Sequence, residues 1–266
     1  MRAAPLTAFR RVVPEDAWRT AVPADVADQL PATARPLPGE GPGADRSAAE
    51  EDLAAAARLL AGGWLRLHGQ AARGPAGLTF AIASDLSGAA SLVRRVTSTT
   101  DPDRPLGLVP DPEISLLPAS QLVEEVLRLL PARAEAATAA RPDATPVSCP
   151  PEVAATLVRA LRADDPALVR AACVQLGTDE PPALLASLTH LRGEFSLLLN
   201  APGTPSQVVH LLLGTDGWVE SRIDATGVHH RRVDVNDLRN TLTDAIAGAA
   251  ERAARTAHLM DQERGT

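Results

Sequence analysis

The chain contains no lysine, so all 26 of its basic residues are arginine. A phosphate-binding loop ending in Gly-Lys-Ser or Gly-Lys-Thr and a lysine Schiff base are therefore excluded. Tyrosine is also absent and aromatic residues make up only 2% of the 266 residues, so Leu, Val and Ala must form the core. The two cysteines, Cys149 and Cys173, have neither the spacing nor the number expected of a metal cluster or a disulfide framework.

Charge and hydropathy exclude two further classes of function. The net charge of −7 argues against a general nucleic-acid binder, which needs a basic surface to neutralise phosphates. No apolar run approaches the roughly 18 residues that a membrane-spanning helix needs, and the N-terminus lacks the apolar core of a signal peptide. We therefore expect a cytoplasmic protein that binds neither nucleic acid nor a membrane.

The most informative stretch predicts an antiparallel meander followed by a helix. Four strand-length apolar segments are separated by turns rich in Gly, Pro, Asn and Asp, at residues 195–199, 208–213, 218–224 and 228–233. Asp234 or Asn236 can cap the helix that follows. Its apolar residues fall on one face and include Leu238 and Leu242.

The first half of the chain repeats this order of elements. Ser47 and Glu50 form a capping box at the start of a helix, and four short strands follow between residues 78 and 117. A second helix runs from Pro118 to Pro131. We divide the chain into an N-terminal segment with a Pro/Gly-rich linker, a first α/β half, an Ala/Pro linker and a second α/β half with a C-terminal helix, at residues 1–46, 47–132, 133–150 and 151–266.

A similarity between two segments of the sequence supports an origin of the two halves by duplication. The segment Leu117–Leu122 matches Val233–Leu238 in its apolar spacing, at the passage from a strand to a helix in each half. We predict an α/β fold of the α+β kind, with pseudo-twofold symmetry and antiparallel sheets flanked by helical bundles.

No constellation of residues predicts an enzyme, a metal site or a cofactor. His229 and His230 are adjacent in a predicted strand, so they point to opposite faces and cannot bind one metal together. The alternative is an enzyme or small-molecule-binding protein whose site is assembled from scattered residues, with His190, Glu194 and His210 as its candidates.

Four segments of the chain together resemble those of a known family. They are the strand-to-helix passage at residues 114–131, which ends in Leu129-Leu130-Pro131, the strand entry at Arg192–Phe195, the hairpin with Gly217-Trp218-Val219 and the C-terminal helix. In these segments the chain is similar to the EspG family, the chaperones of ESX (type VII) secretion in actinobacteria. The resemblance implies a non-enzymatic chaperone that masks a helical secretion substrate, PE/PPE-like or WXG100-like, before export.

Partner binding is expected in the C-terminal half, near the hairpin and the helix from Asp234. Alternate residues of a strand face opposite sides, so one side of the hairpin must point away from its own helix-packed core. The resemblance and this alternation together give the candidate contact residues Trp218, Val219, Val228, His229, Leu238 and Leu242. A homodimer that uses an exposed sheet edge is a further alternative.

Overall fold

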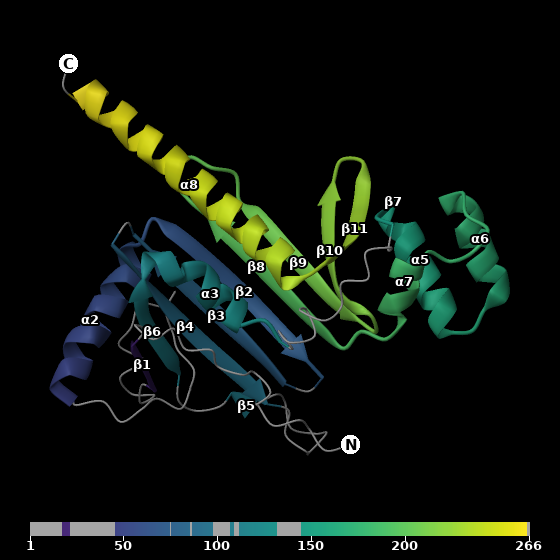
Figure 1. The fold of residues 1–266 in the computed structure, drawn as a ribbon, viewed down its shortest axis with the longest axis horizontal. Helices are drawn as coiled ribbons and strands as arrows, with labels where there is room; N and C mark the ends of the chain where they lie inside the picture. The colour runs from purple at the N-terminus through teal and green to yellow at the C-terminus, as the bar shows by residue number, and fades with distance from the viewer. Residues whose placement is uncertain are drawn as a thin grey trace. The chain divides into compact units, whose positions relative to one another are not determined.

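The computed structural model describes residues 18–21, 46–74, 76–85, 87–97, 107–108, 112–131 and 145–264. It confirms an α+β fold of antiparallel strands and helices (Figure 1). Most of the predicted segment 1–46 and of the linker 133–150 lies outside these residues. Among the helices described, none is long and apolar enough to cross a membrane. Two compact units are present: unit 1 takes the described residues of 1–130, 197–207 and 239–266, and unit 2 those of 131–196 and 208–238.

The sheet of unit 1 is an antiparallel meander with one added edge strand. Strands β2, β3, β4 and β6 are neighbours in this order, β1 pairs with β6, and the short β5 pairs with β4. Their bounds are Trp18–Ala21 for β1, Leu65–Arg73 for β2, Ala76–Ser84 for β3, Gly88–Thr97 for β4, Gly107–Leu108 for β5 and Glu113–Pro118 for β6. A 3-10 turn (Ala119–Gln121) leads from β6 into helix α3 (Leu122–Arg128).

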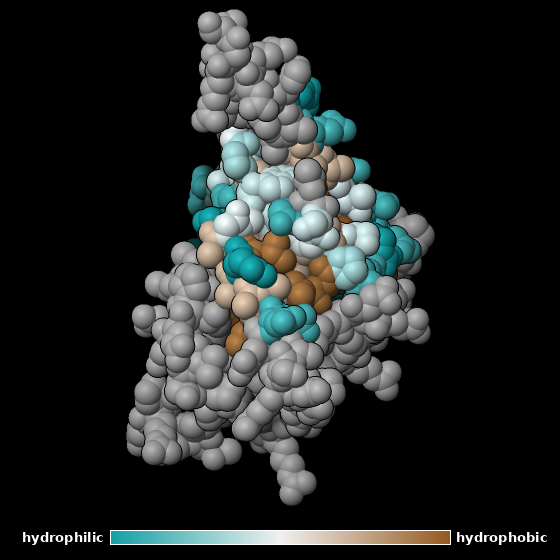
Figure 2. All heavy atoms as spheres, turned by 90° about the vertical axis from the view of Figure 1, so that its left-hand side faces the viewer, coloured by the Kyte–Doolittle hydropathy of each residue, from teal (hydrophilic) through white to brown (hydrophobic). Residues whose placement is uncertain are grey.

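Helix α2 (Arg46–Gly62) packs on one face of this sheet. It begins one residue before the predicted capping residue Ser47. The buried side chains on this face are small or aliphatic, namely Ala56, Leu60, Ala83, Ala90, Leu92 and Ile114. On the face shown in Figure 2, hydrophobic side chains occupy a limited central area bordered by hydrophilic ones. A core without tyrosine is thus filled by short aliphatic side chains that pack closely.

The other face of this sheet carries a buried network of four charged residues. Arg128 of α3 places Nη2 2.5 Å from Glu113 Oε1 and 2.8 Å from Glu125 Oε1. Arg95 of β4 lies 3.1 Å from Glu113 Oε2. Burial alone would lower the pKa of Arg128, but Glu125 and Glu113 outweigh it and hold this pKa above its ordinary value. Ion pairs between these side chains therefore link α3 to β4 and β6.

The sheet of unit 2 has the strand order β8-β9-β10-β11-β7. The bounds are Val147–Cys149 for β7, Gly193–Asn200 for β8, Gln207–Gly214 for β9, Gly217–Asp224 for β10 and Gly227–Val233 for β11. The four strands of the predicted meander are therefore present, each within two residues of its predicted limits. Strand β7, which lies inside the predicted linker 133–150, pairs with β11.

Helices α5 (Pro151–Arg162), α6 (Pro166–Leu176) and α7 (Ala183–Ala186) cover one side of this sheet. Asp165 caps α6 by accepting from the backbone N–H groups of Ala167 and Leu168, and Gly177 ends the helix in the left-handed conformation. The buried cluster beneath the helices contains Cys149, Ala154, Leu157, Ala172, Cys173, Leu184, Leu185, Leu188 and Val219.

The long C-terminal helix α8 spans Val235–Arg264. Asp234 Oδ1 accepts from the backbone N–H groups of Asn236 and Asp237, which confirms one of the two predicted caps. From Arg239 onward the helix belongs to unit 1. There Arg239 Nη2 lies 2.8 Å from Glu124 Oε1, so α8 and α3 are linked by an ion pair.

Each half of the chain has the same strand order. A first strand (β1 or β7) precedes a helix, a meander of four strands follows, and the first strand returns to pair with the last strand of the meander, β6 or β11. A helix then follows that last strand in both halves. The equivalent order agrees with the predicted duplication, and a different strand order would have excluded it.

Candidate partner-binding surface

Strands β9 and β10 separate before they end. Residues Leu211–Gly214 of β9 pair with Gly217–Glu220 of β10, and no pairing continues beyond them. Strand β10 stays paired with β11 as far as Asp224 and Gly227. Within the described part of the chain, Ser221–Asp224 therefore have a strand on one edge only. We call the diverging ends of these strands, Val208–His210 and Ser221–Asp224, the fork.

The helices cover only part of their side of the sheet. Leu212 and Val219 are register partners on this side and pack against the helices. Because strand residues alternate, His210 and Val208 of β9 and Ser221 and Ile223 of β10 point to the same side, farther along the fork. Val208 is 67% exposed and Ile223 is 74% exposed. We call Val208, His210, Ser221, Ile223 and His230 the open sheet face.

His230 is a buried polar residue of this open sheet face. Its Nδ1 lies 2.9 Å from Ser221 Oγ, while its Nε2 has no hydrogen-bond partner in the described structure. Burial lowers the pKa of the imidazole, and the neighbouring His229 and His210 lower it further. A neutral imidazole with one unused nitrogen is costly inside a protein, because a buried polar group without a partner loses its hydration.

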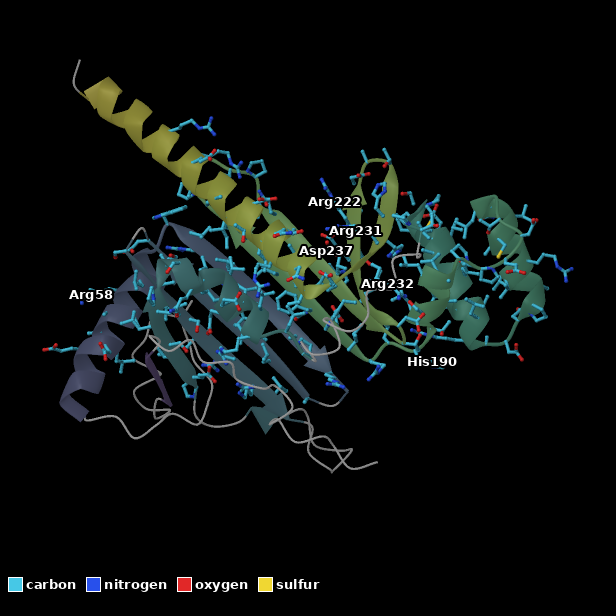
Figure 3. The ribbon with its side chains drawn as sticks, viewed as in Figure 1. Arg58, His190, Arg222, Arg231, Arg232 and Asp237 are labelled. Atoms are coloured by element: carbon cyan, nitrogen blue, oxygen red, sulfur yellow. The ribbon has the colours of Figure 1, made fainter. Side chains whose placement is uncertain are left out.

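The opposite side of the hairpin is polar. Figure 3 labels Arg222 and Arg231 there, and Arg231 forms an ion pair with Glu220. Asp224 Oδ1 accepts from the backbone N–H and the hydroxyl of Thr226, and its Oδ2 lies 3.0 Å from His229 Nε2. Arg222 is exposed and has no carboxylate partner in the part of the chain that the structure describes.

The structure places five of the six predicted contact residues in the interior. Trp218, Val219, Val228, Leu238 and Leu242 are buried, and only His229 lies at the surface. Trp218 and Val219 point to opposite sides of β10, so both sides of the sheet are covered at this end of the hairpin. Contact of these six residues with a partner remains a prediction. In this structure Trp218, Val219 and Val228 are buried residues of the hairpin and Leu238 and Leu242 are buried residues of α8, whereas the exposed Val208 and Ile223 lie on the diverging ends of β9 and β10.

The residues of the alternative small-molecule site are brought together only in part. His210 Nε2 lies 3.4 Å from Glu194 Oε1, on the surface of β8 and β9. His190 is exposed and forms no hydrogen bond or ion pair with either residue. Within the described ranges, no group of three or more His, Cys, Asp or Glu residues is arranged to hold a metal ion.

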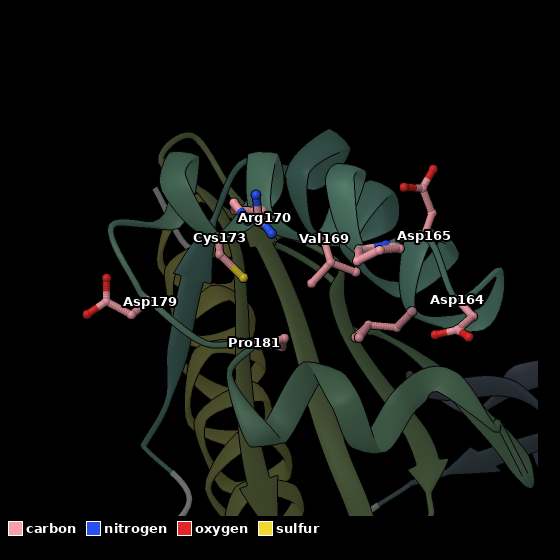
Figure 4. Close-up of a pocket in the computed structure, with 9 residues that line it drawn as sticks. Asp164, Asp165, Val169, Arg170, Cys173, Asp179 and Pro181 are labelled. Carbon is pink, nitrogen blue, oxygen red and sulfur yellow. The ribbon is translucent and has the colours of Figure 1, made fainter.

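A pocket of about 310 Å³ lies among the helices of unit 2 (Figure 4). Its floor includes Val169 and Cys173, and its rim carries Asp164, Asp165 and Asp179. Asp165 is already engaged as the cap of α6. The rim carboxylates are exposed and the pocket holds no buried polar group aimed at a ligand, so no site is assigned to it.

Comparison with known proteins identifies a fold. No family model matches the chain, and no curated protein matches its sequence. A solved structure of the Mycobacterium tuberculosis type VII secretion system chaperone EspG5 in complex with the PE25-PPE41 dimer matches with a TM-score of 0.51 and 11% identity. The match covers 85% of this chain and 96% of that one. A dehydratase domain of a mycocerosic acid synthase-like polyketide synthase reaches a TM-score of only 0.17, which carries no argument. The chain thus shares the fold of a type VII secretion chaperone.

Proposed function

We propose that this protein is a chaperone that binds and masks a helical protein substrate of a type VII secretion system before export. The fold similarity carries the proposal, because it extends over 96% of a chain from a structure in which the chaperone EspG5 is bound to a PE25-PPE41 dimer. Under this proposal the protein acts in the cytoplasm of an actinobacterium, and its partner is PE/PPE-like or WXG100-like. It needs no catalytic group and no cofactor.

The open sheet face is the proposed contact surface. Val208 and Ile223 are among the large apolar side chains that unit 2 exposes, and they lie on the diverging ends of β9 and β10. Burying an aliphatic side chain of this size contributes about 1.5 to 3 kcal/mol before the costs of association.

Two features of the surface suit a helix rather than a strand. The open sheet face continues the side that α5, α6 and α7 already cover, so a further helix would extend an existing helical layer. Val208, Ser221 and Ile223 on it are short or aliphatic, which favours close packing of a helix on a sheet. Of the predicted contact residues, Val219 and Val228 are buried on the same side of the sheet as Ile223, and Trp218 is buried on the opposite side.

The test compares two valines of unit 2 that are similarly exposed. Affinity capture from the native host identifies the partner, and calorimetry then measures its affinity for the purified chain. We expect Val208→Asp to weaken binding by about tenfold or more, since a charge would be buried against the partner. Val174→Asp, at a position 72% exposed on α6, should change the affinity less than about twofold.

Thermal unfolding of both variants serves as the folding control. Both substitutions replace exposed side chains, so we expect melting temperatures close to that of the unchanged protein. Equal partner affinity of Val208→Asp and the unchanged chain would refute the open sheet face as the contact. Capture of no helical secreted protein at all would refute the chaperone function.

A further inference from the structure

The free edge of β10 offers a second interaction surface. Ser221–Asp224 pair with β11 on one side only, and Arg222, Ile223 and Asp224 are all exposed. In an antiparallel ladder, alternate residues turn their backbone N–H and C=O groups toward opposite neighbours. Half of the backbone groups along this edge are therefore available to another strand.

The side chains along this edge are self-complementary. When two copies of Ser221–Asp224 run antiparallel with Ile223 opposite the partner's Ile223, Arg222 lies opposite the partner's Asp224. By symmetry, Asp224 lies opposite the partner's Arg222. Directly opposed residues of two strands lie close enough for ion pairs and apolar contacts. One symmetric register thus forms two ion pairs and one contact between isoleucines.

The charges needed for this register are present in the free chain. Arg222 has no carboxylate partner among the described residues. Asp224 accepts two hydrogen bonds at Oδ1 from Thr226 and lies near His229 at Oδ2, yet a carboxylate has about four acceptor positions. Hydrogen bonds from Thr226, with a smaller effect of His229, hold the pKa of Asp224 well below its ordinary value, so the carboxylate is ionised.

We propose that a second copy of this chain pairs with it through the β10 edges, in a symmetric antiparallel contact centred on Ile223. A two-fold axis requires the same surface patch on both copies. The β10 edge fulfils this requirement, because its own residues are complementary to the same residues of a second copy. The contact covers few residues, so the dimer is weak and depends on protein concentration. It does not rest on the proposed chaperone function.

Sedimentation velocity over a concentration series of the full chain tests the pairing. Arg222→Asp places an aspartate opposite the partner's Asp224, and Asp224→Arg places an arginine opposite the partner's Arg222. Each variant alone should dissociate with a Kd raised about tenfold or more. An equimolar mixture of the two should recover a heterodimer within about threefold of the original Kd, because opposite charges then face each other again.

Recovery in the mixture separates pairing from damage to the hairpin, since a misfolded hairpin cannot be restored by a second damaged copy. Arg170→Asp changes an exposed arginine of α6 and should leave the Kd unchanged. The proposal is overturned if the unchanged chain is monomeric up to about 100 µM, if the single variants dimerise normally, or if mixing them restores nothing.

Discussion

Removing Arg128 is expected to destabilise unit 1 strongly. Its guanidinium contacts Glu113 at 2.5 Å and Glu125 at 2.8 Å, and the side chains of these three residues are 0% to 2% exposed. Arg128→Met keeps much of the side-chain volume but leaves two buried carboxylates with one remaining cation in the network, Arg95, which contacts Glu113. Breaking a buried ion pair by removing one partner costs about 3 to 5 kcal/mol. We therefore expect Arg128→Met to lower the free energy of unfolding by about 4 kcal/mol.

Urea unfolding followed by circular dichroism measures this loss, and hydrogen exchange of the β4 and β6 amides locates it. Glu125→Gln supplies the matched control, because Ser91 can still donate to the amide oxygen that replaces the carboxylate. The double variant Arg128→Met with Glu125→Gln leaves Glu113 and Arg95 as a neutral pair. It should be more stable than Arg128→Met alone. A loss below about 1 kcal/mol, or additive effects within about 0.5 kcal/mol, would refute the reasoning.

Two further predictions concern unit 2. Stability should fall as the pH drops below about 6.5, because the lowered pKa of buried His230 makes the unfolded chain bind the proton first. His230→Gln should flatten this decline in melting temperature whereas the exposed His190→Gln should not, and equal slopes would contradict it. Gly227→Ala should cost about 2 kcal/mol or more, since φ is +141° and a Cβ would lie 2.6 Å from Cys149 O. Gly177→Ala, left-handed but with open space, should cost about 1 kcal/mol in the same urea unfolding, and an equal cost at both sites would contradict the steric argument.

The meander of the second half was predictable because its signals are local. Gly214, Gly217 and Gly227 mark the two tight turns, and apolar runs of strand length lie between them. The cap at Asp234 is local as well, since its carboxylate binds N–H groups two and three residues ahead. For such elements, neighbouring residues alone determine the structure.

Strands β2 and β7 were not predicted, because what makes them strands lies far away in the sequence. Leu65–Arg73 contains a glycine, two alanines and a glutamine in its middle, and only its pairing with β3 defines it. Val147–Cys149 is three residues long and is followed by Pro150, so its own sequence does not distinguish a strand from a linker. Its strand character comes from pairing with β11.

The candidate surface was predictable only as a region. Alternation indicated that one side of the hairpin points away from the core, but it could not say where along β10 the helical cover stops. Both Trp218 and Val219 are buried at one end, whereas Ile223 is exposed at the other. The exposed stretch begins where β9 and β10 stop pairing, beyond Leu211 and Glu220. The apolar pattern of a single strand does not reveal where its pairing with another strand ends.

The return of each first strand to the end of its meander has a consequence for how the chain folds. Trp18 pairs with Leu116 and Cys149 pairs with Val228, whereas the strands within each meander, β2-β3-β4-β6 and β8-β9-β10-β11, pair in the order in which they follow along the chain. Closing so long a loop costs entropy that the contact recovers only at the end. During synthesis β1 and β7 leave the ribosome before the strands they need, and must wait unpaired until β6 and β11 have been made. The hairpins therefore form first, and the docking of these two early strands is the late, slow step that completes each half.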